Sequence, residues 1–155
     1  PWEENCMHPI IHFKTDGVTF YIDLQKRFTK LSDNSGTGKT YLCNALISSM
    51  KVSKDLGITP VTDIDSNNPM TVIIVNGTER TTETFTDRNT LFIIDEADIL
   101  FTQRPDLIQN ILENETSYFL IIARAVNQEL TFDYTERAKL KRDANDKIIS
   151  LRYSE

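Results

Sequence analysis

The chain has 155 residues, of which 39% are hydrophobic and 26% charged, a composition typical of a soluble domain with a buried core. Its net charge of −6 argues against a large non-specific nucleic-acid footprint, and no apolar run reaches the about 20 residues that span a bilayer. Cys6 and Cys43 imply no disulfide framework. We therefore expect a cytoplasmic protein with no membrane segment, for which nucleic acid is not favoured as a partner.

The first half of the chain predicts strands, a loop and a helix, in that order. Apolar, β-branched runs at 10–13 and 18–24 flank the turn signal Asp16-Gly17 and predict a hairpin. A strand over 27–32 leads into a polar, glycine-bearing loop. Apolar residues at helical spacing then predict a helix over 41–50.

The second half begins with residues 53–69, where turn formers dominate and no element is predicted. Continuous apolar runs then predict buried strands over 70–75, 91–94 and 118–123. Pro105, followed by apolar residues at helical spacing, predicts an amphipathic helix. The runs at 138–141 and 148–153 predict a terminal hairpin.

Apolar strands separated by helices imply an α/β fold with a mostly parallel central sheet and helices on its faces. The two predicted hairpins would add antiparallel strands at its N-terminal and C-terminal edges. We expect the whole chain, 1–155, to form a single domain.

The loop before the first helix has the properties of a phosphate-binding loop. Its glycines let the backbone approach an anion, its N–H groups form an anion nest, and the helix adds its positive dipole end. We expect the phosphates to be held by Asn34, Ser35, Gly36, Thr37, Gly38, Lys39, Thr40 and Tyr41. Lys39 would reach the β- and γ-phosphates, and the Thr40 hydroxyl would bind magnesium.

A pair of acids follows the buried strand at 91–94. The strand and the acids after it resemble a Walker B motif, which implies that Asp95, at the carboxyl end of that strand, helps to hold magnesium. Glu96 is expected to act as the base or positioner for an attacking water. Two adjacent carboxylates repel one another unless a cation compensates them, which is a role that magnesium fills.

Together these segments resemble the P-loop NTPases, with a Walker B motif of the group that carries an additional acidic residue. The resemblance covers roughly 27–124 and implies ATP and Mg²⁺ as ligands, Lys39 and Glu96 as catalytic residues, and Thr40 and Asp95 as metal-binding residues. Asp33 stands where the family pattern has its first glycine. Asp tolerates a left-handed backbone better than most residues, but its carboxylate would repel phosphates.

The resemblance also divides the chain and suggests two related families. A nucleotide-binding core over 27–124 would be preceded by a hairpin region, 1–26, and followed by a C-terminal hairpin, 125–155. The opening hairpin resembles ABC-type ATPase heads, although the Leu-Ser-Gly-Gly signature is missing, and the AAA+ group is a comparable candidate. The strand at 118–123 resembles the one that carries a polar sensor residue, for which Arg124 and Asn127 are the candidates.

Basic residues gather near the C-terminus, at Arg137, Lys139, Lys141, Arg142, Lys147 and Arg152. In a hairpin, positions 137, 139 and 141 share one face. That face would meet nucleic acid or another acidic partner, or it is a solvated strand face that discourages edge aggregation. We prefer the second interpretation.

We consider three functions. The first is an ATPase that drives or switches an unidentified protein partner or a second copy of the chain. ATP is favoured over GTP because no Asn-Lys-x-Asp motif occurs. The second is a degenerate nucleotide switch without turnover, which Asp33 favours. The third is a small-molecule kinase, for which Arg80, Arg88 and Arg104 would grip the phosphoryl groups.

Overall fold

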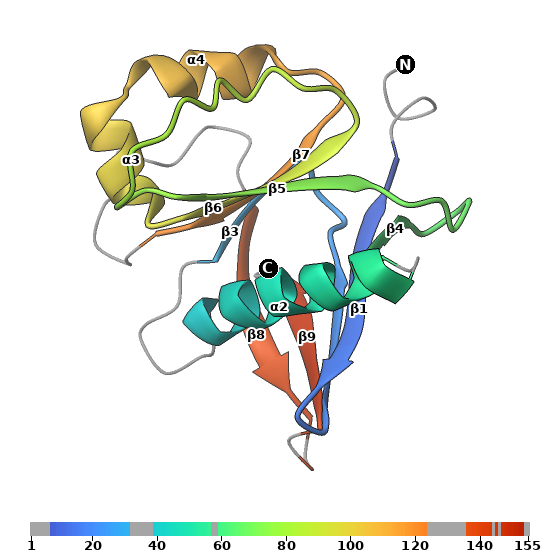
Figure 1. Cartoon of the computed structure of the whole chain (residues 1–155). Helices are drawn as coiled ribbons and strands as arrows, with labels where there is room; N and C mark the ends of the chain where they lie inside the picture. Colours follow the sequence, from blue (N-terminus) through green and yellow to red (C-terminus); the bar gives the residue numbers. More distant parts are fainter. Residues whose placement is uncertain are drawn as a thin grey trace.

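The computed structural model describes residues 7–31, 39–56, 59–123, 136–143, 145 and 147–153, and for residues 39, 40, 53, 136 and 137 it describes only the backbone. The elements, in chain order, are β1 (Pro9–Thr15), β2 (Val18–Asp23), β3 (Phe28–Leu31), α2 (Lys39–Leu56), β4 (Val61–Asp63), β5 (Thr71–Asn76), β6 (Thr90–Asp95), α3 (Ala97–Gln103), α4 (Asp106–Glu113), β7 (Tyr118–Ile122), β8 (Glu136–Arg142) and β9 (Ile148–Tyr153). Figure 1 shows α2 in front of the strands β1, β8 and β9, and α3 and α4 at the other end of the sheet.

The nine strands form one sheet in the order β4-β1-β2-β9-β8-β3-β7-β6-β5. Five of its eight neighbouring pairs are parallel and three are antiparallel. The sheet is also strongly twisted, since β8 and β9 run at a steep angle to β5 and β6 in Figure 1. The fold is therefore α/β with a mixed sheet: the strands β3, β7, β6 and β5 are parallel to one another, as predicted, and the antiparallel pairs lie in the other half.

The C-terminal hairpin forms as predicted, but it does not lie at an edge. β8 pairs in parallel with β3, and β9 pairs in parallel with β2, so the hairpin joins the two ends of the sheet. The N-terminal hairpin lies one strand in from the edge, which β4 occupies. In this position Ala138 and Ile149 are fully buried in the core beneath α2, and burial of apolar side chains favours the arrangement.

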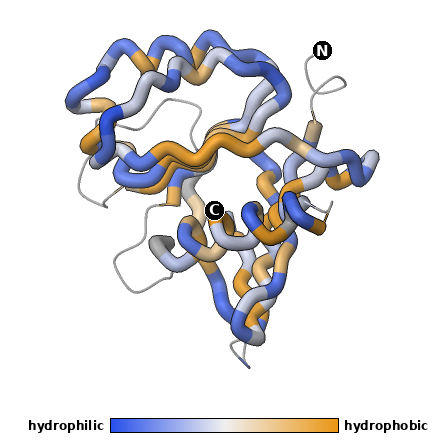
Figure 2. Tube along the Cα trace, viewed as in Figure 1, coloured by the Kyte–Doolittle hydropathy of each residue, from blue (hydrophilic) through white to orange (hydrophobic). Residues whose placement is uncertain are grey.

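The core lies in two clusters on the two faces of the sheet. The first packs Leu42 and Leu46 of α2 against strands from both ends of the sheet. The second lies under α3 and α4, where the rings of Phe92 and Phe119 stack with centroids 5.1 Å apart and Phe85 meets Phe92 edge-on. The hydrophobic colour in Figure 2 is accordingly concentrated along the central strands.

Local sequence explains most of the elements. The β1–β2 turn has positive φ at Asp16 (50°) and Gly17 (77°), which is the geometry of a two-residue hairpin turn that favours Asp-Gly. The helix predicted at 41–50 is longer than expected, because α2 continues to Leu56 with Val52 and Leu56 exposed. These exposed turns bury no apolar stripe, so the pattern that identifies a helix stops before the helix does.

Candidate functional site

The phosphate loop is expected beside β3, which occupies a special place in the sheet. After β3 and α2 the chain forms β4 at one edge of the sheet and then β5 at the other edge. It returns towards β3 through β6 and β7 and then continues to β8 on the other side of β3. Ligands of α/β sheets bind outside the carboxyl ends of the strands at such a switch point. The helix α2 begins at Lys39, and residues 32–38, with Asp33 and the loop residues Asn34 to Gly38, lie outside the described part of the chain.

Asp95 also lies at the carboxyl ends of the parallel strands. It is the last residue of β6, is half-buried, and stands beside Asn76 at the end of β5. Its Oδ1 accepts a hydrogen bond of 2.9 Å from the backbone N–H of Glu96. Burial, and secondly the charge of Asp95, raise the pKa of the Cys43 thiol to about 12. Cys43, one turn after Lys39, and Ile93, two residues before Asp95, lie in the same core cluster, so β6 packs against the first turns of α2.

Glu96 adopts a strained backbone at the start of α3. Its φ of 52° and ψ of 45° are left-handed, and a left-handed residue other than glycine costs about 1 to 3 kcal/mol. Its carbonyl accepts hydrogen bonds from the N–H groups of Ile99 (3.1 Å) and Leu100 (3.2 Å). The helix α3 thus begins immediately after the acidic pair and fixes the direction of its backbone.

Gly77 supports this backbone from the neighbouring strand. It is buried directly after β5, and its N–H donates a 2.7 Å hydrogen bond to the carbonyl of Asp95. A Cβ at Gly77 would lie 2.1 Å from the carbonyl oxygen of Glu96 and 3.0 Å from the nitrogen of Leu100. The sequence analysis missed this residue, because the apolar pattern ends with the strand predicted over 70–75 and carries no signal for a contact with the acidic pair.

The structure describes only some of the other predicted site residues. Lys39 and Thr40 are the first two residues of α2, described by backbone alone, and the sensor candidates Arg124 and Asn127 fall outside the described residues. The ring of Tyr41 lies 5.7 Å from that of Phe20, and its hydroxyl donates to Asp16 Oδ2 at 3.3 Å. Desolvation and the Asp16 carboxylate raise the pKa of Tyr41, with the charge of Arg142 opposing them. A nucleotide contact by Tyr41 would therefore come from its backbone.

The chemistry of Asp95 and Glu96 at the end of β6 fits a magnesium ion whose other ligands are phosphate oxygens. Within the described ranges, no group of three or more His, Cys, Asp or Glu residues could hold a metal ion. Magnesium in nucleotide sites needs less, since one or two carboxylates plus phosphate oxygens and waters complete its shell. Asp95 supplies one such carboxylate at the end of β6.

Of the arginines considered for a kinase, Arg104 is paired with a carboxylate and Arg88 lies far from the acidic pair. Arg104 forms a bidentate pair with Asp106, with Nε–Oδ1 at 3.0 Å and a terminal nitrogen to Oδ2 at 2.9 Å. Arg88 precedes β6 and therefore lies at the opposite end of that strand from Asp95. Neither is directed at the acidic pair, which weakens the interpretation as a small-molecule kinase.

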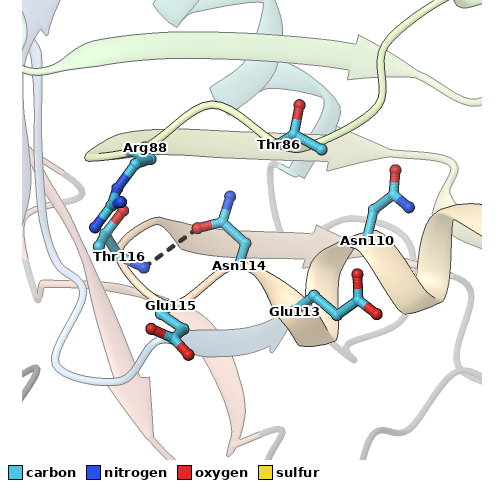
Figure 3. A pocket seen from close by; sticks show the side chains of 7 residues that line it. All are labelled: Thr86, Arg88, Asn110, Glu113, Asn114, Glu115 and Thr116. Carbon is cyan, nitrogen blue, oxygen red and sulfur yellow. Dashed lines mark hydrogen bonds between the residues drawn. The ribbon is translucent and has the colours of Figure 1, made fainter.

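A cavity of about 300 Å³ lies at the opposite, amino-terminal edge of the sheet (Figure 3). Its lining is polar and consists of Thr86, Arg88, Asn110, Glu113, Asn114, Glu115 and Thr116. The Asn114 amide donates to the carbonyls of Phe85 (2.9 Å) and Asp87 (2.8 Å), and its oxygen accepts from the N–H groups of Thr116 (3.2 Å) and Ser117 (3.0 Å). With these bonds made inside the protein, Asn114 joins two loops instead of presenting a ligand site.

Replacing Asn114 with Ala should lower the free energy of unfolding by about 2 to 3 kcal/mol, because buried backbone groups of both loops lose their partner. Urea unfolding measures the change. Gln109→Ala is the control: Gln109 is exposed, and its side-chain bond to Glu113 is of a kind that contributes little. Equal stability of the Asn114 variant and the parent would show that water replaces the amide.

Two comparisons with known proteins bear on the site. The model of the ATPase family associated with various cellular activities (AAA) matches residues 31–144, which is well over half of the chain. The match runs from the end of β3 to just beyond β8 and so includes the start of α2 and the acidic pair. No curated protein matches the sequence. Within the described residues, no helix has the length and apolar character needed to cross a membrane.

Proposed function

Because the chain belongs to the AAA family of P-loop ATPases, we propose that it binds ATP with Mg²⁺ and hydrolyses it to drive or switch a protein partner. The observation that carries the proposal is the approach of the two motifs. Cys43, one turn into the helix that follows the phosphate loop, and Ile93, two residues before Asp95 in β6, are buried in the same core cluster although they are far apart in sequence. The family match favours the AAA+ resemblance over the ABC-type one.

Each predicted residue has a distinct role in this proposal. The backbone of residues 34–38 and the Lys39 ammonium group hold the phosphates, and Thr40 and Asp95 hold the metal. When bound, magnesium neutralises charge on the phosphate oxygens. Glu96 orients the attacking water and accepts its proton on the side-chain carboxylate. Asp33 adds a negative charge close to the phosphates, so turnover is expected to be slow.

The domain boundaries and the surroundings of the protein are also proposals. We place the ATPase core at 27–124 within a single domain, with the hairpin region 1–26 before it and 125–155 after it. A cytoplasmic location, and a partner that is a protein or a second copy of the chain, follow from the same function. The switch without turnover and the kinase are the alternatives, and membership of an ATPase family favours neither.

Replacing Lys39 with Ala should weaken ATP binding by at least about 30-fold, since truncating one partner of a desolvated charge pair costs about 2 kcal/mol or more. Calorimetric titration of ATP with magnesium measures this. Lys54→Ala removes the same charge from the exposed last turn of the same helix and should bind like the parent. Equal affinity of the parent and Lys39→Ala would refute the assignment of the phosphate loop.

Phosphate release measured alongside binding separates the three functions. Magnesium-dependent release in the absence of any other substrate is the result expected of an ATPase. Binding without release would identify the switch, and release only with an added small acceptor would identify the kinase.

A further inference from the structure

In one half of the sheet, the helix α2 covers one face, and several of the described side chains on the other face are exposed. In β1, β2, β8 and β9 the side chains of Phe13, Phe20, Ala138 and Ile149 point towards α2 and are buried. Because side chains alternate along a strand, the residues between them point to the opposite face. The helices α3 and α4 do not cover that face, since they pack in the second core cluster against β3, β5, β6 and β7.

The strand register assembles a continuous surface on this exposed face. His12 pairs with Tyr21, Tyr21 with Ser150, and Ser150 with Lys141, so these four residues form one row across β1, β2, β9 and β8. Lys139 pairs with Arg152 in an adjacent row. On the other side of the central row, Thr19 stands between Lys14 and Ile148. We call this surface the basic sheet face and define it by His12, Lys14, Tyr21, Lys139, Lys141, Ile148 and Arg152.

The basic sheet face concentrates positive charge on a chain whose net charge is −6. All of its defining side chains are exposed, including Tyr21 (42%) and Ile148 (45%). Within the described ranges, neither the three lysines of this face nor the guanidinium group of Arg152 forms an ion pair. The carboxylate on this side of β2, Asp23, is already bound by His8 Nε2 at 2.5 Å.

We propose that the basic sheet face binds single-stranded nucleic acid. The cations provide the sequence-independent attraction to phosphates, and the exposed ring of Tyr21, with His12 edge-on at 5.3 Å, provides a platform on which a base can stack. Sheets that combine an exposed aromatic ring with flanking cations suit single strands, whose bases are free to leave their own stack. An acidic polypeptide would use the cations but not the ring.

The sequence did not favour this partner, because the net charge is −6 and only the basic residues of the C-terminal hairpin were apparent. The structure adds residues from β1 and β2, which are more than one hundred positions away in the chain. This proposal is independent of ATP binding, because the face lies on the opposite side of the sheet from α2.

The test measures fluorescence anisotropy of a labelled oligothymidylate of about 20 nucleotides with the whole chain, at about 50 mM salt and without nucleotide. The single strand should bind more tightly than a duplex of the same length. Lys139→Ala/Lys141→Ala should weaken binding at least about tenfold and reduce the slope of log K against log salt by about 1.4, since each lost phosphate contact removes about 0.7. The matched control is Lys51→Ala/Lys54→Ala, which removes the same charge from exposed residues of α2 and should leave the affinity unchanged.

Tyr21 separates nucleic acid from other polyanions. Tyr21→Ala should lose about tenfold in affinity and Tyr21→Phe should retain it, because stacking needs the ring and not the hydroxyl. No binding by the parent chain, or an equal loss in both lysine double variants, would overturn the proposal. So would displacement by polyglutamate as readily as by unlabelled oligonucleotide together with full binding by Tyr21→Ala, since that pattern indicates an acidic polypeptide as the partner.

Discussion

Replacing Glu96 with Gln should slow ATP hydrolysis by at least about 10²-fold, as expected when a general base is lost, while ATP remains bound. The change keeps the size and polarity of the side chain and removes only the charge and the ability to accept a proton. Phosphate release under saturating ATP measures the rate, and calorimetry measures the affinity. A variant that turns over at the parent rate would assign Glu96 to structure.

A second substitution at position 96 distinguishes a catalytic role of Glu96 from a structural one, because the backbone there is left-handed. Glycine adopts the left-handed conformation observed there without the steric penalty. Glu96→Gly should therefore lose hydrolysis as Glu96→Gln does, yet be more stable than Glu96→Gln by up to about 1 kcal/mol. Urea unfolding of the two variants gives the comparison. Lower stability of Glu96→Gly would show that the side chain holds α3 in place.

The strands and the position of the acidic pair could be predicted because local patterns determine them. Continuous apolar runs identified β5, β6 and β7, and the change from Ile94 to Asp95 marked the end of β6. The helix α3 carried a usable signal that was missed, since its buried residues Ala97, Leu100 and Phe101 have helical spacing. The acids beside them were interpreted as a motif that follows a strand, and no helix was sought there.

Other features depend on contacts between distant residues, which no local pattern encodes. The strand β4 has three residues and exists because it pairs with β1. Its Asp63 is buried, and although burial favours the neutral acid, hydrogen bonds from Ser66 and the His8 backbone hold the pKa of Asp63 below its usual value. The insertion of the C-terminal hairpin between β2 and β3 is likewise a long-range pairing. The phosphate loop itself stays a prediction, because residues 32–38 lie outside the described part of the chain.

The close approach of Gly77 to the acidic pair is the long-range contact with the most direct consequence for the proposed activity. The atoms that a Cβ at Gly77 would meet, the carbonyl oxygen of Glu96 and the nitrogen of Leu100, belong to the backbone. The clash therefore cannot be relieved by rotating a side chain. The clash can be removed only by moving β5 away from β6 or by displacing the start of α3, and either movement shifts Glu96.

Gly77→Ala should consequently lower the free energy of unfolding by about 3 kcal/mol, in the range of severe overpacking, and should reduce turnover more than ATP affinity. Urea unfolding, phosphate release and ATP titration on the same preparation measure the three quantities. Gly17→Ala is the matched control, because Gly17 has a φ of +77° but nothing within 4 Å of an added Cβ; it should lose about 1 kcal/mol from backbone strain and hydrolyse ATP normally. If Gly77→Ala is as stable and as active as the parent, the backbone at Glu96 has room to move, and its left-handed conformation is not held from β5.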